Sequence, residues 1–297
     1  VEWVDEESYF FRLSKWEKPL LDYYEKNPNF ISPKSRRNEV ISFVKSGLKD
    51  LSVSRKSFSW GIPVPNNNEH VIYVWLDALT NYISALNYPD INNKMYKDFW
   101  PATVHLIGKD ILRFHAVYWP AFLLAAKLPL PKKVYGHGWI LSGEEKMSKS
   151  KGNILDPIEI INQYGLDPLR YYLIKEVSFG NDGNISQERL EDCINSDLAN
   201  NYGNLCQRVT AFAIKNCDGK IPLEINFQNE DLIILNKYRD NLDNIRSQID
   251  KQNINFYIDY IVNSLFEANK YFNDQEPWKK KDDQTRLNTI VYTTLEI

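Results

Sequence analysis

The sequence contains few cysteines and no long hydrophobic run, and each absence narrows the class of protein. Its three cysteines, Cys193, Cys206 and Cys217, are an odd number, and none of them belongs to a C-x-x-C pair. This pattern argues against a disulfide framework and against a metal site, and it indicates reduced thiols in a cytoplasmic protein. No apolar stretch is long enough to span a bilayer and no signal peptide is visible, so we expect no membrane partner.

A strong net charge is also missing. The 36 Lys and Arg residues nearly balance the 39 Asp and Glu residues, which leaves a formal net charge of −3 at pH 7. Any contact with nucleic acid must therefore come from local basic patches. The 297 residues are enough for two domains that each have a core. The chain begins with Val1 rather than methionine, which indicates a portion of a longer protein, and nothing in the sequence indicates an oligomeric state.

Short apolar runs of β-forming residues alternate with helical patterns in the first half of the chain. From this pattern we predict buried strands over residues 71–75, 103–107 and 133–141. Apolar residues at helical spacing predict helices over residues 5–27, 38–49 and 111–127. The order strand, helix, strand is typical of a parallel sheet, so the predicted fold class is α/β with a partial Rossmann-like sheet.

The second half of the sequence is almost wholly helical. A cluster of turn-forming residues over 180–184 precedes it, so we place the domain boundary between residues 183 and 184. Ser186 is a predicted N-cap for the first of the helices that follow. Helical patterns cover residues 187–216, 229–249, 252–273 and 283–297. We therefore predict an α/β domain over residues 1–183 and an all-α helical bundle over residues 184–297.

The segment Lys146-Met147-Ser148-Lys149-Ser150 places two lysines and two hydroxyls in a loop flanked by Gly143 and Gly152. Lysine is a compact point charge on a flexible stem, so this composition suits the charge that develops on a leaving pyrophosphate. A run of lysine and serine is usually a solvated surface turn, so the segment alone leaves both interpretations open. Parallel sheets bind ligands at the carboxyl ends of their strands. The segments predicted at that edge are residues 75–82, residues 108–115 and this lysine loop.

This pentapeptide is the signature loop of class I aminoacyl-tRNA synthetases, and four blocks make the chain resemble the methionyl-tRNA synthetase family over nearly its whole length. The blocks are Trp75–Tyr82, Gly108–His115 with Trp119-Pro120, Gly136–Trp139 leading into the lysine loop, and Pro277-Trp278. The resemblance implies a Rossmann-type catalytic domain followed by a helical anticodon-binding domain. It also implies methionine–tRNA ligase activity, in which ATP activates methionine to methionyl-adenylate and the aminoacyl group passes to tRNA(Met).

The resemblance assigns an aromatic site to the methionine side chain. A thioether has no formal charge, so its site needs polarisable aromatic walls and at most one weak hydrogen-bond donor. The residues matched to the family pattern are Trp75, Leu79, Tyr82, Ile111, Phe114, His115 and Trp119. Leu79 stands where some family members carry proline. Spacing alone would equally place these side chains in the hydrophobic core, with His115 as a core histidine.

For ATP, the resemblance implies two segments besides the lysine loop. Gly108 lets the backbone approach the ligand, and Asp110 can accept from ribose hydroxyls, although Asp110 also fits a helix N-cap. The segment His137-Gly138-Trp139-Ile140 resembles the one that holds adenine, largely through main-chain groups. Lys149, with Lys146 second, would stabilise the pyrophosphate, so these two lysines are the expected catalytic residues. ATP is expected to bind together with Mg²⁺.

The helical half supplies the expected contacts with the tRNA anticodon. Trp278 precedes Lys279-Lys280-Lys281, and an aromatic side chain beside lysines suits an unstacked base with phosphate contacts. In the family a tryptophan at this place stacks on the anticodon. Asn204 and Arg208 lie four residues apart on one helix face and resemble the polar pair that reads anticodon bases. Asn201 is the alternate, and a solvated helix face is the competing interpretation of all three.

One signature of class I synthetases is missing from the sequence. No histidine lies in a His-x-Gly-His turn, so we expect the C-terminal portion of the enzyme, which lacks the N-terminal half of the catalytic domain and forms no adenylate alone. The zinc knuckle that family members carry would lie in the absent part, so zinc stays undecided. Three other classes remain open: a non-catalytic tRNA-binding module, a leucyl, isoleucyl or valyl synthetase, and a nucleotidylyltransferase of the same fold.

Overall fold

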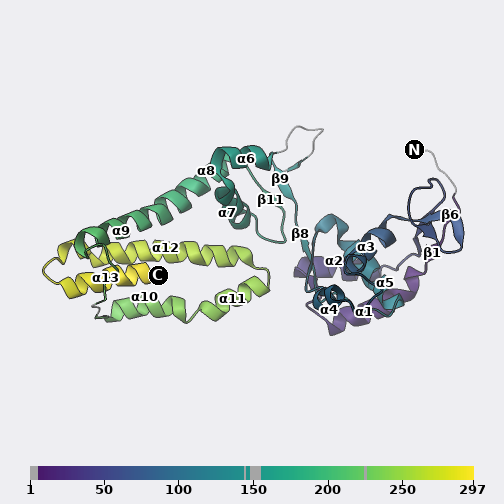
Figure 1. Ribbon diagram of the computed structural model, residues 1–297, viewed down its shortest axis with the longest axis horizontal. Coiled ribbons are helices and arrows are strands. Elements are labelled where there is room, and N and C mark those ends of the chain that lie inside the picture. Colours follow the sequence, from purple (N-terminus) through teal and green to yellow (C-terminus); the bar gives the residue numbers. More distant parts are fainter. Residues whose placement is uncertain (1–5, 144, 148–154, 224–225) are drawn as a thin grey trace. The chain divides into compact units, whose positions relative to one another are not determined.

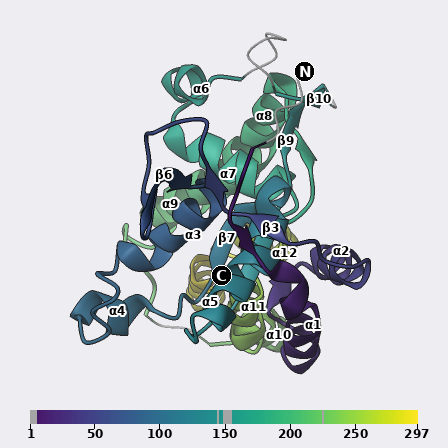
Figure 2. The same cartoon turned by 90° about the vertical axis from the view of Figure 1, so that its right-hand side faces the viewer.

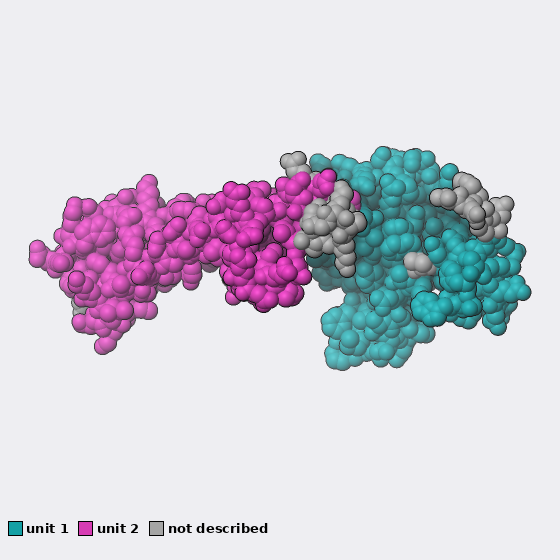
Figure 3. All heavy atoms as spheres, turned by 90° about the horizontal axis from the view of Figure 1, so that it is seen from above, with its two compact units in different colours: residues 1–138 teal, residues 139–297 magenta. Residues whose placement is uncertain are grey.

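The computed structural model describes residues 6–143, 145–147, 155–223 and 226–297. The chain divides into two compact units, which we call the N-terminal unit (residues 1–138) and the C-terminal unit (residues 139–297) (Figures 1 and 3). The boundary between these units therefore lies between residues 138 and 139, whereas the sequence suggested a boundary between residues 183 and 184. Residues 139–183 therefore pack with the helical second half, and a functional boundary at residue 183 stays a prediction.

The N-terminal unit is built on a three-stranded parallel sheet in the order β2-β8-β7. Its strands are β2 (Ile31–Ser32), β7 (His105–Gly108) and β8 (Val134–His137). β7 and β8 pair with Gly108 opposite His137, so both strands end at the same edge of the sheet. The predicted parallel sheet is therefore confirmed, although its third strand is β2, which the sequence pattern did not reveal.

The strand predicted over residues 71–75 is wrong in its second half. β6 (Asn67–Ile72) pairs antiparallel with β4 (Ser54–Arg55) and β5 (Pro63–Val64) in a separate small sheet. The chain then enters α3 (Val74–Ser84), so Trp75 lies in the first turn of a helix. A short apolar run cannot by itself distinguish a buried strand from the start of a buried helix, which explains the error.

The helix predicted from residue 5 begins later than expected. β1 (Phe10–Phe11) pairs with β3 (Leu51–Ser52), and the chain continues as η1 (Leu13–Trp16) and α1 (Glu17–Lys26). This pairing joins segments that lie far apart in the sequence. Periodicity reports only which face of a local segment is apolar, so it did not reveal a strand that depends on a distant partner.

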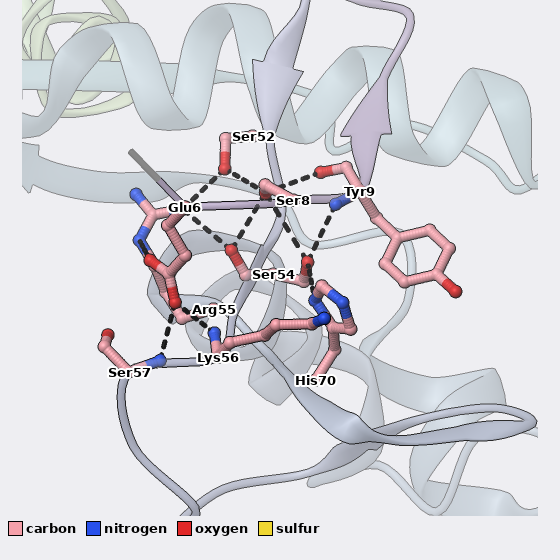
Figure 4. Close-up of polar contacts among 9 residues, drawn as sticks. All are labelled: Glu6, Ser8, Tyr9, Ser52, Ser54, Arg55, Lys56, Ser57 and His70. Atoms are coloured by element: carbon pink, nitrogen blue, oxygen red, sulfur yellow. Dashed lines mark hydrogen bonds and ion pairs between the residues drawn. The ribbon is translucent and has the colours of Figure 1, made fainter. Parts of the chain in front are cut away.

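Polar contacts tie the residues before β1 to β4 and β6 (Figure 4). The backbone N–H of Tyr9 donates to Ser54 Oγ at 2.8 Å, and the Ser8 hydroxyl donates to the Ser54 carbonyl oxygen at 3.0 Å. Ser54 is fully buried, and its Oγ also lies 3.1 Å from Nδ1 of His70. These contacts satisfy buried polar groups and hold the start of the unit against its small antiparallel sheet.

The remaining helices of the N-terminal unit lie along the chain between β2 and β8 (Figure 2). They are α2 (Lys34–Lys45), α4 (Lys94–Phe99), the 3₁₀-helix η2 (Lys109–Ile111), the π-helix η3 (Phe114–Tyr118) and α5 (Trp119–Ala125). The helix predicted over residues 111–127 is thus present, with a π-helical segment in its middle. α2 packs against β2 and η3, and α3 packs against α5.

A second small sheet opens the C-terminal unit. Its strands are β9 (Ile140–Ser142), β10 (Glu145–Lys146) and β11 (Gly183–Asn184), and β9 lies between the other two. The strand predicted over residues 133–141 is therefore split into β8 and β9. The expected turn at residues 183–184 is instead β11, because these residues pair in parallel with β9.

Helices make up the rest of the C-terminal unit (Figure 1). They are α6 (Pro157–Tyr164), α7 (Leu166–Glu176), α8 (Gln187–Cys193), the π-helix η5 (Ile194–Gly203), α9 (Asn204–Asn216), α10 (Asn229–Arg239), α11 (Leu242–Asp250), α12 (Ile254–Gln275), the 3₁₀-helix η6 (Pro277–Lys279) and α13 (Gln284–Glu296). The side chain of Ser186 caps α8 as predicted by accepting from the backbone N–H of Arg189. The all-α bundle is confirmed. None of the helices in the described parts of the chain is both long and apolar enough to cross a membrane.

Candidate active site

Aromatic side chains from α3, η3 and α5 form one cluster in the N-terminal unit. The rings of Trp75 and Phe114 stack with their centroids 3.6 Å apart and an interplanar angle of 8°. Tyr82 lies on the same helix as Trp75, and its ring centroid is 6.3 Å from that of Trp119. The π-helix η3 presents Phe114 and His115 next to each other in this cluster. Such segments are rare, and they occur often at functional sites.

His115 is held by two hydrogen bonds that define its protonation. Its Nδ1 lies 3.0 Å from the carbonyl oxygen of Ile111, and its Nε2 lies 2.9 Å from the Tyr82 hydroxyl. A carbonyl oxygen only accepts, so Nδ1 carries a proton. Burial lowers the pKa of His115, so the ring is neutral near pH 7 and Nε2 accepts the proton that Tyr82 donates. The remaining lone pairs of the Tyr82 oxygen can therefore only accept.

Two of the residues predicted for this site contribute in other ways. Leu79 is 1% exposed and belongs to the hydrophobic cluster that contains Trp119, so it packs with the aromatic residues as part of the core. The side chain of Ile111 packs with the other core of the unit, which contains Leu112 and Val117. Ile111 therefore reaches this cluster through its carbonyl oxygen, because η2 ends one turn before His115.

His105 and Trp100 also belong to the cluster, although no sequence pattern indicated them. The ring centroid of His105 lies 4.2 Å from that of Tyr82 and 6.2 Å from that of His115. The ring of Trp100 lies 6.1 Å from those of His105 and Trp119. Burial, with a smaller contribution from His115, lowers the pKa of His105 to about 4. The signal that could have found His105 is its place on β7, three residues before Gly108.

The predicted ATP residues of the N-terminal unit meet at the carboxyl edge of the parallel sheet. A Cβ atom on Gly108 would lie 2.7 Å from Oδ1 of Asp110 and 3.9 Å from Cε1 of His137. The three residues are therefore neighbours, and only glycine fits at position 108 with Asp110 in this position. His137 donates from Nδ1 to the carbonyl oxygen of Gly138 at 2.8 Å. Ligands of open α/β sheets bind at this edge, which agrees with the predicted role.

The other half of the predicted adenine segment belongs to the C-terminal unit. The backbone N–H of Trp139 donates to Oδ1 of Asp182 at 2.9 Å, and its carbonyl oxygen accepts from the N–H of Gly183 at the same distance. Ile140 begins β9 and is 43% exposed. Asp182 thus fixes the backbone of this segment. It lies in the turn that the sequence pattern indicated only as a domain boundary.

The lysine loop is described only at its start. The backbone of Lys146 lies in β10 and pairs with Leu141 of β9. Lys149 lies outside the described residues, so its predicted role remains a prediction. The partly buried Met147 packs with the cluster that contains Tyr172 and Leu190.

The predicted anticodon contacts lie on α9 and after α12. Arg208 donates from Nη2 to Oδ1 of Asn273 at 2.5 Å, and its guanidinium carbon lies 5.6 Å from the ring centroid of Phe272. Trp278 also contacts Phe272, in an edge-on arrangement with centroids 6.2 Å apart, and is 40% exposed. Phe272 therefore brings Arg208 and Trp278 to one place, which no spacing in the sequence predicted. Asn204 is exposed one turn before Arg208.

The alternate residue Asn201 is not available for contact with a base. It is 2% exposed, donates to the carbonyl oxygen of Val262 at 3.3 Å and accepts from Asn269 at 3.0 Å. These bonds join η5 to α12, so Asn201 has a structural role. Among the described residues, no group of three or more His, Cys, Asp or Glu side chains could hold a metal ion.

Comparison with known proteins identifies the family. A family model described as tRNA synthetases class I (M) matches residues 1–210. The chain belongs to this family. Within this class I synthetase family, curated relatives described as methionine–tRNA ligase include those of Brucella suis biovar 1 (strain 1330), 54% identical over 298 residues, and Rickettsia felis (strain ATCC VR-1525 / URRWXCal2), 55% identical over 301 residues. Each alignment covers 100% of this chain and 58% and 59%, respectively, of the relative.

Solved structures of the class I synthetase family agree with the fold. Methionyl-tRNA synthetase of Mycobacterium tuberculosis in complex with methionyl-adenylate superposes with a TM-score of 0.94 at 47% identity. The match covers 99% of this chain and 58% of that structure's chain. A structure of the same enzyme in its free state gives a TM-score of 0.91 at 44% identity. The chain therefore spans less than two thirds of the length of the proteins it resembles.

Proposed function

We propose that this chain forms part of a methionine–tRNA ligase. The observation that carries the proposal is the cluster in which Trp75 stacks on Phe114 while Tyr82 donates to a neutral, buried His115. Such a cluster offers polarisable aromatic surface and no formal charge, which is what a thioether requires. Relatives described as methionine–tRNA ligase align with the whole chain at 54–55% identity, which supports the same assignment.

The proposed reaction has two steps. The methionine carboxylate attacks the α-phosphate of ATP, which forms methionyl-adenylate and releases pyrophosphate, and the aminoacyl group then passes to the 3′-terminal ribose of tRNA(Met). Positioning and charge stabilisation supply most of the catalysis in such steps. In this proposal Gly108, Asp110 and the segment 137–140 hold the nucleoside. Lys149, with Lys146 second, stabilises the negative charge that develops on the departing pyrophosphate.

Magnesium would enter this site with the nucleotide. Mg²⁺ is usually bound by one or two carboxylates together with substrate phosphates, and it rarely occupies a cage made wholly of protein ligands. In this proposal Asp110, which lies beside Gly108 at the sheet edge, would supply one such carboxylate. When bound with ATP, the ion would offset phosphate charge. Among the described residues no group of three or more His, Cys, Asp or Glu side chains could hold zinc, so we propose no zinc site there.

We also propose that the C-terminal unit contacts the tRNA anticodon. Trp278 is exposed beside Phe272 and is followed by three lysines, and Arg208 lies against the same phenylalanine. An exposed aromatic ring can stack on an unpaired base while neighbouring cations contact phosphates. Arg208 and Asn204 would then offer hydrogen bonds to base edges from one helix face.

Exchange of pyrophosphate into ATP tests the proposed activity. We expect the full-length enzyme that contains this chain to catalyse exchange that depends on methionine, and we expect leucine, isoleucine and valine not to replace it. Exchange driven by one of those amino acids would assign a different class I synthetase. We expect the 297-residue chain alone to show no exchange, and a substantial methionine-dependent rate from it would refute the view that its catalytic site is incomplete.

A further inference from the structure

Three buried nitrogen atoms next to the aromatic cluster have no hydrogen-bond partner among the described residues. They are Nε1 of Trp100, Nε2 of His105 and Nε1 of Trp119. Their side chains are at most 6% exposed, and the Trp100 ring lies 6.1 Å from the rings of both other residues. Each buried polar group without a partner costs roughly 1–3 kcal/mol. Three such groups on neighbouring rings point to a polar guest among them.

The chemistry of the three nitrogens selects the guest. An indole N–H only donates, so Trp100 and Trp119 both require an acceptor. The ring of His105 is neutral near pH 7, and in the tautomer with its proton on Nδ1 the Nε2 atom accepts a hydrogen bond. A water molecule accepts two hydrogen bonds and donates two others, which matches two donors and one acceptor. An ion fits poorly, because the neighbouring rings are those of Tyr82 and His115, which are neutral near pH 7.

The position of His105 connects this guest with the candidate active site. Its ring is the closest aromatic neighbour of Tyr82 that the structure gives, with centroids 4.2 Å apart. Tyr82 in turn sets the hydrogen bond to His115. A shift of His105 would therefore displace the Tyr82 ring and the direction in which its hydroxyl donates.

We propose that Trp100, His105 and Trp119 bind one internal water molecule, and that His105, fixed by this water, is a positioning residue that holds Tyr82 in its hydrogen bond with His115. The water site is inferred only from the three buried nitrogen atoms that have no partner among the described residues. The positioning role rests on the proposed function, because it assigns His105 an effect on recognition of the methionine side chain. The two parts therefore need separate experiments.

Magnetisation transfer from water to indole protons tests the water site in the 297-residue chain. We expect cross-peaks from a long-lived water at the Nε1 protons of both Trp100 and Trp119, assigned with single Trp→Phe variants. His105→Phe keeps the ring and removes the nitrogens, so both cross-peaks should be lost. His105→Gln offers an amide oxygen near the former Nε2 and should retain them. A wild-type chain without the cross-peaks, or their persistence in His105→Phe, would overturn the proposal.

A matched control separates this effect from a general change in the unit. His70 is 2% exposed in the same unit, but its Nδ1 contacts Ser54 and its ring lies outside the cluster. His70→Phe should leave both indole cross-peaks unchanged. If it removes them as completely as His105→Phe does, the signal reports overall stability and the water site is refuted.

Steady-state kinetics of the full-length enzyme tests the positioning role. His105→Phe should raise KM for methionine roughly tenfold, the factor expected for about 1.4 kcal/mol of lost binding, and should leave KM for ATP unchanged. A purely structural role would change both KM values and kcat together. An unchanged KM for methionine in folded His105→Phe would refute the positioning role. Absence of methionine activation in the wild-type enzyme would instead refute the proposed function and leave the water experiment valid.

Discussion

Replacing Tyr82 with phenylalanine isolates the hydrogen bond on which the candidate site depends. The change removes one oxygen atom and keeps the ring that packs against His105 and Trp119. His115 is 3% exposed, and among the described residues the Tyr82 hydroxyl is the one partner of its Nε2. Burial raises the pKa of Tyr82, so the wild-type hydroxyl is protonated and donates at neutral pH. An unsatisfied buried acceptor costs about 1–3 kcal/mol, and we expect the free energy of unfolding to fall by that amount.

Urea denaturation of the 297-residue chain, followed by tryptophan fluorescence, measures this loss. Tyr96→Phe is the matched control, because Tyr96 is 7% exposed in the same hydrophobic cluster and its hydroxyl makes no hydrogen bond with the described residues. A substitution away from specific interactions usually changes the free energy of unfolding by less than about 0.5 kcal/mol, so the control should remain close to wild type.

Nitrogen chemical shifts of the four histidines provide the second measurement. We expect His115 to be protonated at Nδ1 and unprotonated at Nε2 in the wild type, since the carbonyl oxygen of Ile111 can only accept. A proton on Nε2 would reverse the direction of the hydrogen bond to Tyr82 and would refute the reasoning. Equal losses of stability in Tyr82→Phe and Tyr96→Phe would refute the assigned energy.

Four further predictions test other parts of the site. Gly108→Ala should displace Asp110, because its Cβ would lie 2.7 Å from Oδ1, and should lower adenylation by the full-length enzyme up to about 100-fold as judged by pyrophosphate exchange. Lys149→Ala should lower the adenylation rate by roughly two to four orders of magnitude. Trp278→Ala should weaken tRNA charging by ~1–3 kcal/mol and leave adenylation nearly intact. The pKa of His105 falls from 6.5 unfolded to about 4 folded, so its contribution to stability is fully present above pH 6.5, and about 3 kcal/mol is lost as the pH falls toward 4. Because burial also lowers the pKa of His115, His105→Phe should reduce the acid dependence in urea titrations by about this amount without abolishing it.

Each of these predictions has an outcome that contradicts it. Gly136→Ala places a methyl group 3.3 Å from Cδ1 of Leu112, an apolar and adjustable neighbour, so a loss of exchange equal to that of Gly108→Ala would mean that Asp110 is not the cause. Replacing the exposed Lys215 of α9 with alanine should leave adenylation intact, and an effect like that of Lys149→Ala would show a general charge effect. Equal damage to both reaction steps in Trp278→Ala would make that residue structural. An unchanged acid dependence in His105→Phe would assign it to other groups.

Much of the fold was determined by local sequence patterns. β7, β8 and the helices of the second half were predictable because their apolar residues are buried and their breaks are marked by Gly, Asp and Asn. The cap at Ser186 was also predictable, because a serine hydroxyl satisfies a free N–H at a helix start. The lysine loop and the four sequence blocks indicated the family, which the match over residues 1–210 then established.

Tertiary structure alone decided where the sequence patterns were ambiguous. The apolar residues near Trp75 suit a strand or a helix equally, and antiparallel pairing of β6 with β4 and β5 ends the strand at Ile72. Asn201 is buried because it packs against α12, a helix distant in the sequence. The same helix carries Phe272, which both Arg208 and Trp278 contact. His105 joins the site for the same reason, since β7 brings it against Tyr82. Local residues determine periodicity and capping, whereas the partner of each side chain depends on contacts that close long loops of chain.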